Sequence, residues 1–575
     1  MRGSKAVLKL LEGQGADVIF GYPGANTLPI YDDLLDSSIH HVLVRHEQGA
    51  AHMADGYARS TGRPGICMST SGPGATNLVT GVATAYADSS PMMVITGQVS
   101  TQMLGENAFQ EADIFSLMMP ITKHSFRVLD PNRIPEAIKK GWGIATTGRM
   151  GPVHIDLPVD VLWKQIADEA LYEEFHAPCP VEDMSRVLEA VKLLRDAERP
   201  MMLVGGGAIW SHAGEEVRKL AEMLMAPVAT TMMGKGIIPE DHPLAMGMLG
   251  MHGREVARRA YESCDVMLVV GSRFSDRSTG LPTDLPESTK IIHIDIDPME
   301  AGKNKRTKVR IVGDARKALQ LLIKGLSRAK AGSEWCKRMV HLRQICDCEM
   351  DIDEMPIKPQ KVMLELRKAL SDDAYVCTEV GQNQMWAAHF LRMRTPGHFI
   401  SSGGMGTMGF GFPASLGVKY AHRDKQVVDI AGDGSLQMVS KEFATAMSED
   451  LPVVICLLNN SWLGMVRQWQ KLLNDGRYSG TNLERNPDFV KLARSYGADA
   501  LRVERPSELA EAFEKALRSD VPFLLDIVVD VEEDILPMLP GGRSSKEVIH
   551  GKRCRFGRPH EKLLDKDITM EIAGA

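Results

Sequence analysis

The stretch Val427–Asn460 has the sequence VVDIAGDGSLQMVSKEFATAMSEDLPVVICLLNN. Its two apolar runs, Val427–Ala431 and Val453–Leu458, have the length and composition of buried strands. The residues between them, Leu436–Met447, show the apolar spacing of an amphipathic helix. The stretch therefore predicts one strand–helix–strand unit of a parallel sheet.

Each of these predicted strands ends in a polar cluster. The first is followed by Gly432–Ser435 and the second by Asn459 and Asn460. Because the carboxyl ends of neighbouring parallel strands lie side by side, the two clusters should meet at the edge of the sheet where ligands bind. Carboxylate and amide oxygens suit Mg2+, which takes its other ligands from water and from substrate phosphates. Either cluster alone is also typical of an ordinary turn, but together they predict a diphosphate held through a metal.

The composition is that of a large globular protein. A length of 575 residues predicts three or four domains at about 150 residues per domain. The net charge of -7 gives no basic surface for nucleic acid or an anionic membrane. The nine cysteines form no CxxC pair, which indicates reduced, mostly buried thiols. The sequence shows neither an apolar run long enough to span a membrane nor a leader segment. We therefore expect a soluble, cytoplasmic protein.

Strand-like and helix-like segments alternate along the chain, which predicts an α/β protein with doubly wound parallel sheets. The charged stretches at 166–182 and 326–358 are candidate linkers. In the first part of the chain the predicted strands are Asp17–Gly21, His41–Val44, Ile66–Ser69, Met92–Thr96 and Val153–Asp156. The predicted domains are a first domain at 1–165, a middle domain at 183–325 and a third domain at 358–550, followed by an unassigned tail at 551–575.

Short motifs recur in a fixed order along the chain. They are Gly21–Gly24, His46–Gly49, Ser71–Asn77, Ala108–Asp113, Gly151–Val153, Met248–Gly253, Gly271–Arg277, Gly381–Trp386, Gly404–Gly409, Gly432–Ser435, Asn459–Asn460, Gly464–Gln470 and Pro537–Pro540. In this order they resemble the catalytic subunit of acetohydroxyacid synthase (acetolactate synthase), a member of the thiamine-diphosphate (ThDP) enzyme superfamily. The resemblance covers roughly residues 4–550 and implies a ThDP-dependent enzyme with three α/β domains.

The resemblance assigns Glu47 as the carboxyl group that activates ThDP. By sharing a proton with the aminopyrimidine ring it would supply general acid-base catalysis. From the pattern alone, a glutamate between a strand and a predicted helix at Ala50–Ser60 is more commonly a helix cap or first-turn carboxylate. The resemblance also places Phe109 and Gln110 near the reacting carbons, and Met408 as the support for the bent cofactor.

The same resemblance implies the remaining residues around ThDP. The metal ligands would be Asp433, Asn460 and the backbone carbonyl of Trp462, and the substrate residues Val380, Arg277 and Trp469. The glycine loop after strand Ile66–Ser69 would approach the ring, although such residues also form tight turns into helices. The cofactor-binding residues of these two domains would be Gly72, Gly74, Asn77, Gly381, Gln382, Asn383, Gly406, Gly434, Ser435, Gly464 and Met465.

The middle domain has the pattern of a nucleotide-binding sheet. The predicted strands Met201–Val204, Val228–Thr230, Val266–Val270 and Ile291–Ile294 end in glycines, a threonine or an aspartate. Glycines let backbone approach a pyrophosphate, and a carboxylate can hold a ribose, although such glycines also form structural turns. The resemblance implies FAD without a redox role, because carboligation has no net redox change. Its residues would be Arg149, Gly205, Gly206, Gly207, Thr231, Leu249, Gly250, Met251, His252, Gly271, Arg273, Asp295 and Asp314.

Four positions depart from the family pattern. Val159 replaces a usual lysine, Ala25 and Asn26 replace a Gly-Ala pair, and Asn383 replaces a frequent histidine. An amide can donate to a phosphate oxygen as histidine does, so the last change is mild. Val159 removes a cation and Ala25 adds a Cβ, and their effect on substrate and inhibitor handling stays open.

The resemblance implies that pyruvate is decarboxylated and that its two-carbon unit is joined to pyruvate or 2-ketobutyrate, the entry to branched-chain amino acid synthesis. It also implies a homodimer or tetramer with active sites between subunits, and allows a small regulatory subunit. Two alternatives remain: a pyruvate oxidase or other ThDP-dependent 2-keto acid decarboxylase, and a non-catalytic nucleotide-binding paralogue. The presence of Glu47, Asp433 and Asn460 argues against the paralogue.

Overall fold

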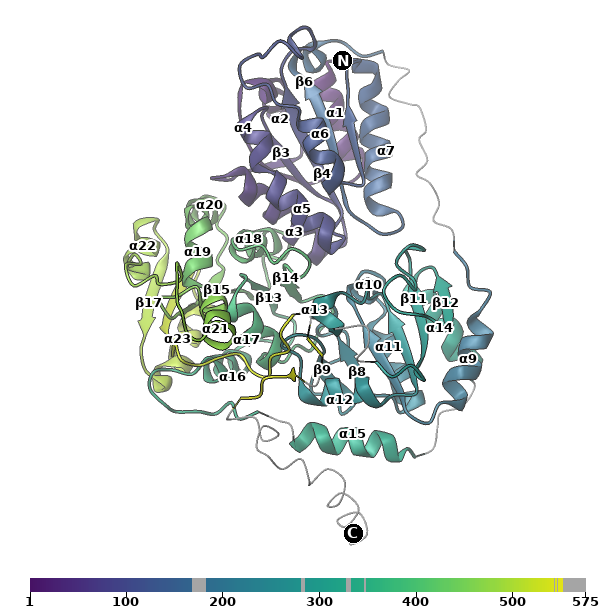
Figure 1. Ribbon diagram of the computed structural model, residues 1–575. Coiled ribbons are helices and arrows are strands. Elements are labelled where there is room, and N and C mark those ends of the chain that lie inside the picture. Colours follow the sequence, from purple (N-terminus) through teal and green to yellow (C-terminus); the bar gives the residue numbers. More distant parts are fainter. Residues whose placement is uncertain are drawn as a thin grey trace.

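The computed structural model contains three separate parallel sheets (Figure 1). It describes residues 1–167, 182–280, 285–326, 332–345, 348–541, 543–544 and 547–551. Most of the predicted linker at 166–182 and nearly all of the tail at 551–575 therefore lie outside the described residues. Each sheet has six strands, all paired in parallel, with helices between them. This confirms the predicted α/β fold with three doubly wound sheets.

The first sheet has the strand order β2-β1-β3-β4-β6-β5. Its strands are β1 (Val18–Tyr22), β2 (His40–Leu43), β3 (Gly65–Ser69), β4 (Met92–Gln98), β5 (His124–Arg127) and β6 (Pro152–Pro158). Its helices are α1 (Gly3–Gly13), α2 (Leu28–Leu34), α3 (Glu47–Thr61), α4 (Pro73–Asn77), α5 (Val79–Asp88), α6 (Ile114–Met118), α7 (Ile134–Thr146) and α8 (Val159–Trp163).

The middle sheet has the strand order β12-β11-β10-β7-β8-β9. Its strands are β7 (Pro200–Val204), β8 (Val228–Thr230), β9 (Ala245–Met248), β10 (Val266–Val270), β11 (Lys290–Asp295) and β12 (Val309–Val312). Its helices are α9 (Val187–Asp196), α10 (Gly206–Trp210), α11 (Gly214–Leu224), α12 (Glu255–Ser263), α13 (Asp276–Thr279) and α14 (Ala315–Leu326). A further helix, α15 (Glu334–Ile345), occupies part of the second candidate linker.

The third sheet has the strand order β14-β13-β15-β16-β18-β17. Its strands are β13 (Tyr375–Thr378), β14 (Phe399–Ser401), β15 (Val427–Gly432), β16 (Val454–Asn459), β17 (Asp499–Val503) and β18 (Phe523–Val528). Its helices are α16 (Pro359–Ala369), α17 (Gln382–Phe390), α18 (Gly411–Ala421), α19 (Asp433–Val439), α20 (Phe443–Ser448), α21 (Gly464–Leu473), α22 (Phe489–Ser495) and α23 (Leu509–Leu517).

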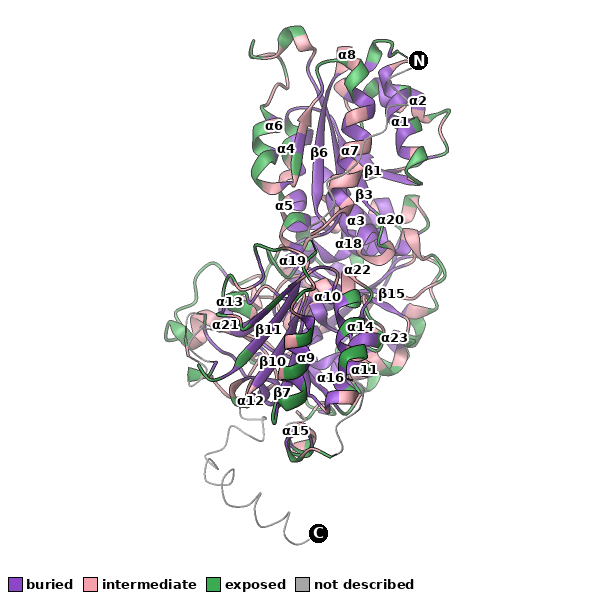
Figure 2. Cartoon of the chain, turned by 90° about the vertical axis from the view of Figure 1, so that its right-hand side faces the viewer, coloured by how far each residue is buried: buried purple, intermediate pink, exposed green. Residues whose placement is uncertain are grey.

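The strands of the opening stretch lie where the sequence predicts them. β15 and β16 pair in parallel, with Val428 opposite Val454 and Gly432 opposite Leu458. Helices cover both faces of such a sheet, so its strands are almost continuously buried (Figure 2). The prediction of a single helix at Leu436–Met447 is wrong. The chain forms two helices there, α19 and α20, with a 3-10 turn at Ser440–Glu442 between them.

The first and third domains pack together through helices α3 and α18 (Figure 1). A Cβ at Gly56 of α3 would lie 2.1 Å from the backbone oxygen of Ala414 in α18, so the helices approach closely only because Gly56 lacks a side chain. One hydrophobic core, which includes Met53 and Tyr57 of α3 and Leu416 of α18, extends through both domains. The middle domain has cores of its own.

Two further sequence predictions concern the thiols and the membrane. The cysteines of the described residues are free, and all but Cys348 are buried. Cys179, Cys346 and Cys554 lie outside the described residues. In the described part of the chain, no helix has both the length and the apolar character needed to cross a bilayer.

Candidate active site

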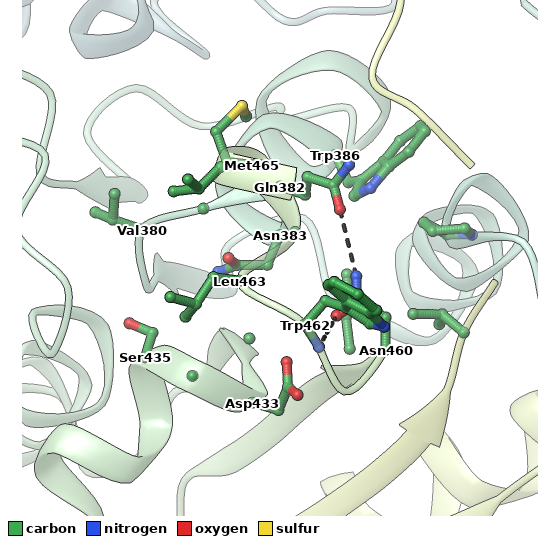
Figure 3. Close-up of a pocket in the computed structure, with 18 of the residues that line it drawn as sticks. Val380, Gln382, Asn383, Trp386, Asp433, Ser435, Asn460, Trp462, Leu463 and Met465 are labelled. Carbon is green, nitrogen blue, oxygen red and sulfur yellow. Dashed lines mark hydrogen bonds between the residues drawn. The ribbon is translucent and has the colours of Figure 1, made fainter. Parts of the chain in front are cut away.

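A pocket of about 620 Å3, including solvent at its mouth, opens at the carboxyl ends of β13, β15 and β16. This is the edge of the third sheet at which the sequence predicted that two polar clusters would meet. All residues that line it lie between Pro359 and Asp530. The predicted site residues among them are Val380, Gly381, Gln382, Asn383, Met408, Asp433, Gly434, Ser435, Asn460, Trp462, Gly464 and Met465 (Figure 3).

Asp433 carries a buried carboxyl group in this pocket. Asp433 is 2% exposed, and Asn486 Nδ2 donates a hydrogen bond to Asp433 Oδ2 at 2.7 Å. Burial raises the pKa of Asp433 to about 6, and the hydrogen bond from Asn486 opposes this rise. A bound cation would stabilise the charged form of this carboxylate. Asn486 was missed by the sequence analysis, because nothing in its surroundings in the chain links it to Asp433.

Asn460 and Trp462 lie on the loop after β16, beside the same space (Figure 3). The Trp462 N–H donates to Asn460 Oδ1 at 3.0 Å, and Asn460 Nδ2 donates to Gln382 Oε1 at 3.3 Å. The amide oxygen keeps a second lone pair. A carboxylate, an amide oxygen and a backbone carbonyl are hard oxygen ligands, so Asp433, Asn460 and Trp462 fit Mg2+.

Hydrogen bonds also fix the side chains of Gln382 and Asn383 in the pocket. Gln382 Nε2 donates to Gln468 Oε1 at 2.9 Å, and Asn383 Nδ2 donates to the backbone oxygen of Ile430 at 2.8 Å. An amide group has two N–H bonds, so Asn383 keeps one for a phosphate oxygen. The Ser435 hydroxyl donates to the carboxylate of Glu379, a residue that the sequence analysis did not single out.

The first-domain residues come together, but they are not among the residues that line this pocket. Glu47 is the first residue of α3, is largely buried, and accepts a hydrogen bond from Asn77 Nδ2 at 2.9 Å through Oε2. A Cβ at Gly74 would lie 3.1 Å from Glu47 Oε1, and one at Gly72 would lie 2.7 Å from the backbone oxygen of Gln110. Glu47 is thus both a first-turn carboxylate and a neighbour of the glycine loop. None of these residues lines the third-domain pocket.

The other predicted catalytic residues, Phe109 and Met408, differ in their surroundings. Phe109 is 88% exposed, whereas Met408 lines the pocket. Gly406 lies on the same loop as Met408, and a Cβ there would be 3.8 Å from Val380 Cγ1. The structure therefore groups Gly406 and Met408 with the third-domain pocket, and leaves Phe109 on the surface of the chain.

Arg277 and Trp469, the predicted acceptor residues, form a pair outside the pocket. The Arg277 guanidinium carbon lies 5.9 Å from the Trp469 ring centre. Arg277 is exposed and also lies 3.5 Å from Asp276, so it forms a surface ion pair as well. Trp469 is half-buried, and its Nε1 has no hydrogen-bond partner among the described residues. It lies one turn after pocket-lining Met465 in α21, on the same helix face.

The glycine turns of the middle domain leave room for close backbone contact. A Cβ at Gly207 would lie 2.7 Å from Gly271 Cα, and one at Gly205 would lie 2.3 Å from the Gly271 backbone oxygen. Buried side-chain atoms without partners among the described residues occur on Thr231 and on both ring nitrogens of His252. Buried polar atoms normally have partners, so these atoms fit contacts to a polar ligand such as FAD.

The charged residues predicted at the FAD site have partners on several elements. Arg149 lies 3.1 Å from Glu300 and donates through Nε to Ser89 Oγ at 2.9 Å. Arg273 donates to the backbone oxygen of Ala87 at 2.8 Å. The remaining residues of this predicted set are Gly206, Leu249, Gly250, Met251, Asp295 and Asp314, of which Asp314 accepts from the N–H of Lys317 at 2.9 Å in the first turn of α14.

Three of the departures lie in the first domain. Asn26 Nδ2 donates to Ser71 Oγ at 2.6 Å, which ties the turn at Ala25–Thr27 to the glycine loop. Val159 is the first residue of α8 and is half-buried. These contacts show how the two segments are held and do not explain a change of substrate.

Family models match all three parts of the chain. The N-terminal TPP binding domain of thiamine pyrophosphate enzymes matches residues 1–117, the central domain 187–322, and the C-terminal TPP binding domain 379–527. The fold, the pocket and these matches together define a ThDP-dependent enzyme.

Similar proteins narrow the family further. The chain is 49% identical over 561 residues to a probable acetolactate synthase large subunit of Methanocaldococcus jannaschii, covering 94% of each. It is 45% identical over 607 residues to the acetolactate synthase large subunit of Corynebacterium glutamicum, covering 100% of this chain and 96% of the other. It is 41% identical over 565 residues to that of Haemophilus influenzae, covering 96% and 98%. The chain belongs to the acetolactate synthase large subunit family.

Proposed function

We propose that this chain is the catalytic subunit of an acetolactate synthase. It decarboxylates pyruvate and joins the two-carbon unit to a second 2-keto acid, pyruvate or 2-ketobutyrate, at the first common step of branched-chain amino acid synthesis. The observation that carries this proposal is the third-domain pocket, where Asp433, Asn460, Ser435 and Met408 converge at the carboxyl edge of the sheet. Full-length similarity to acetolactate synthase large subunits supports it.

Bound ThDP supplies the electron sink that makes loss of CO2 from a 2-keto acid possible. The chain binds and orients this cofactor. Glu47 would hold a proton at the pyrimidine ring. Asn77 fixes the carboxylate of Glu47. Asp433, Asn460 and the Trp462 carbonyl would hold Mg2+, and Gln382 and Ser435 would bind the diphosphate. Arg277 and Trp469 receive the carboxylate and alkyl group of the acceptor.

The positions of the two half-sites support the proposed subunit arrangement. Among the described residues, the proposed metal and diphosphate pocket is lined by the third domain, and the Glu47 cluster belongs to the first domain. In the proposed enzyme, the first domain of one subunit closes the pocket of another, in a homodimer or tetramer. The name "large subunit" of the relatives supports a small regulatory partner. The proposed domain limits are 1–165, 183–325 and 358–550, and the proposed location is the cytoplasm.

FAD in the middle domain is part of the proposal. Arg149, Arg273, Thr231 and His252 hold it, without a redox change in the reaction. The purified protein should be yellow and should keep its oxidised flavin spectrum while pyruvate is consumed. A colourless protein that forms acetolactate would contradict the FAD assignment and leave the carboligase activity intact.

Product analysis tests the activity directly. The purified protein is incubated with pyruvate, ThDP and Mg2+, and its products are measured by mass spectrometry together with CO2 release and oxygen uptake. Acetolactate should account for the pyruvate consumed, at one CO2 for two pyruvate molecules. Oxygen uptake equal to CO2 release would instead identify an oxidase, acetaldehyde a decarboxylase, and no turnover a non-catalytic paralogue.

A further inference from the structure

Glu379 is a buried carboxylate to which the proposed reaction assigns no task. It follows the last residue of β13 and precedes Val380, which lines the pocket. The residue is fully buried, and its backbone N–H donates to the Ile430 oxygen of β15 at 3.0 Å. Glu379 is therefore fixed between two strands whose carboxyl ends form the pocket.

The Glu379 side chain joins two other parts of the pocket. Its Oε2 accepts hydrogen bonds from the Gly409 N–H at 2.7 Å and from the Ser435 hydroxyl. Its Oε1 accepts from the Phe412 N–H at 3.0 Å. Gly409 directly follows Met408, so one carboxylate contacts both the loop that would support the cofactor and the serine that would bind its diphosphate.

The start of α18 packs closely against Glu379. A Cβ at Gly411 would lie 2.4 Å from Glu379 N and 2.3 Å from Asp429 Oδ1. Gly411 begins α18, so Glu379 also lies at the positive end of a helix dipole, where a negative charge is favoured. Glu379 is thus a rigid link between the Met408 loop, α18 and Ser435.

The charge of the neighbouring carboxyl groups is consistent with this link. Asp429 on β15 is fully buried, and neither of its oxygens has a hydrogen-bond partner in the described part of the chain. Burial and the nearby charge of Glu379 raise the pKa of Asp429 well above its ordinary value. Burial also raises the pKa of Glu379, but its hydrogen bonds oppose the rise. Of the two carboxyl groups, Glu379 is the one with hydrogen-bond donors that favour its charged form.

We propose that Glu379 is a positioning residue for ThDP, whose carboxylate holds the Met408 loop and the Ser435 hydroxyl in the arrangement that the cofactor requires. The inference rests on the proposed function, because ThDP must bind in this pocket. Glu379 acts through Met408 and Ser435 and not on the reacting atoms.

Glu379→Gln tests the link with little change of shape. One side-chain oxygen becomes an NH2 group, which faces the N–H of Gly409 or of Phe412 instead of accepting from it. The measurement is the dissociation constant of ThDP at saturating Mg2+, by calorimetry. We expect it to rise about 10-fold to 100-fold, the effect of losing a hydrogen bond to a charged group. Turnover at saturating ThDP should also fall, with the KM for pyruvate unchanged. Glu379→Asp keeps both acceptors and should recover part of the affinity.

Asp33→Asn is the matched control for loss of a buried carboxylate. Asp33 lies in the first domain, away from the pocket, and accepts from the Ser4 hydroxyl at 2.5 Å and from Arg2 at 2.7 Å. The Asp33→Asn substitution should lower the melting temperature without weakening ThDP binding. If Glu379→Gln does not fold, Glu379→Asp provides the test. It should bind ThDP more weakly than the parent protein does, while its melting temperature is no lower than that of Asp33→Asn.

A double-mutant cycle with Ser435→Ala tests the partner. If Glu379 acts through Ser435, the loss of ThDP affinity in the double variant is smaller than the product of the two single losses. Losses that multiply, or a Glu379→Gln protein that binds ThDP as the parent does, would overturn the inference. A parent protein that binds no ThDP would instead refute the proposed function.

Discussion

The guanidinium carbon of Arg277 lies 5.9 Å from the ring centre of Trp469, although Arg277 belongs to the middle domain and Trp469 to the third. Trp469 is on the same face of α21 as Met465, which lines the pocket. A cation and an aromatic ring are thus held together beside the proposed cofactor site. This geometry suits a 2-keto acid, which has a carboxylate at one end and an alkyl group at the other.

Trp469→Leu should remove the preference for 2-ketobutyrate over pyruvate as acceptor. An indole that contacts the alkyl group discriminates one methylene by about 1 to 3 kcal/mol, or roughly 10-fold to 200-fold. The measurement is the product ratio with both acceptors in competition. Trp163→Leu is the matched control, because Trp163 also packs against an arginine, with Arg2 5.0 Å from its ring, but in the first domain. An unchanged ratio in folded Trp469→Leu would show that the indole does not contact the acceptor.

Glu47→Gln should lower turnover by about 100-fold to 10,000-fold, because glutamine keeps the shape of glutamate but cannot share a proton. Turnover is measured at saturating ThDP and Mg2+. Glu136→Gln, in the first turn of α7, is the control for loss of a first-turn charge. Such a charge affects stability by about 0.3 to 1 kcal/mol and should leave turnover unchanged. If Glu47→Gln turns over within threefold of the parent, Glu47 is only a first-turn carboxylate.

Removal of divalent cations should release ThDP, and Mg2+ should restore its binding. The diphosphate is anionic, and Asp433 adds a further buried negative charge that needs a cation. In Asp433→Asn the Mg2+ concentration for half-maximal ThDP binding should rise at least about 10-fold, since even outer-shell changes at metal sites commonly cost that much affinity. The readout is bound ThDP after chelation and dialysis. Equal ThDP binding with and without Mg2+ would contradict the assigned metal site.

Asp295→Asn should stabilise the flavin-free protein above pH 6. Burial raises the pKa of Asp295 from 3.8 to about 6, so the folded state holds a proton that the unfolded chain has lost between these values. The charged carboxylate therefore costs stability above pH 6, and the cost disappears below pH 4. Asparagine retains an oxygen for the Asp297 N–H, which donates to Asp295 at 2.9 Å. Melting temperatures from pH 4 to 8 should show a gain that grows up to about pH 6 and then stays constant. A gain independent of pH would contradict this origin.

The sheets could be predicted because each buried parallel strand has its own continuous apolar run. The sequence placed a strand at Val427–Ala431, and β15 extends one residue further. The helix after it was predicted unbroken, because its apolar spacing continues through Ser440–Glu442. The Glu442 side chain accepts hydrogen bonds from the Arg45 N–H of the first domain at 3.2 Å and from Thr445 Oγ1 at 2.6 Å. Contacts with another domain, which local spacing does not encode, fix the chain at this break.

The candidate site, like the sheets, could be predicted in part from the sequence. The topology of parallel strands was enough to bring Asp433 and Asn460 to one edge, and the motifs supplied the other residues. Glu379 was missed, although an acidic residue directly before the predicted diphosphate segment was a usable signal. Its donors Gly409, Phe412 and Ser435 come from later segments, so only the folded chain shows that they share one carboxylate.

The core shared by the first and third domains determines when the chain can finish folding. During synthesis the first domain leaves the ribosome before the third, so the face of α3 around Gly56 stays uncovered while the middle domain is being made. The middle domain can fold at once on its own cores. The first domain reaches its final stability only after α18 has been translated, and chains that end before Gly411 keep an apolar surface open to aggregation.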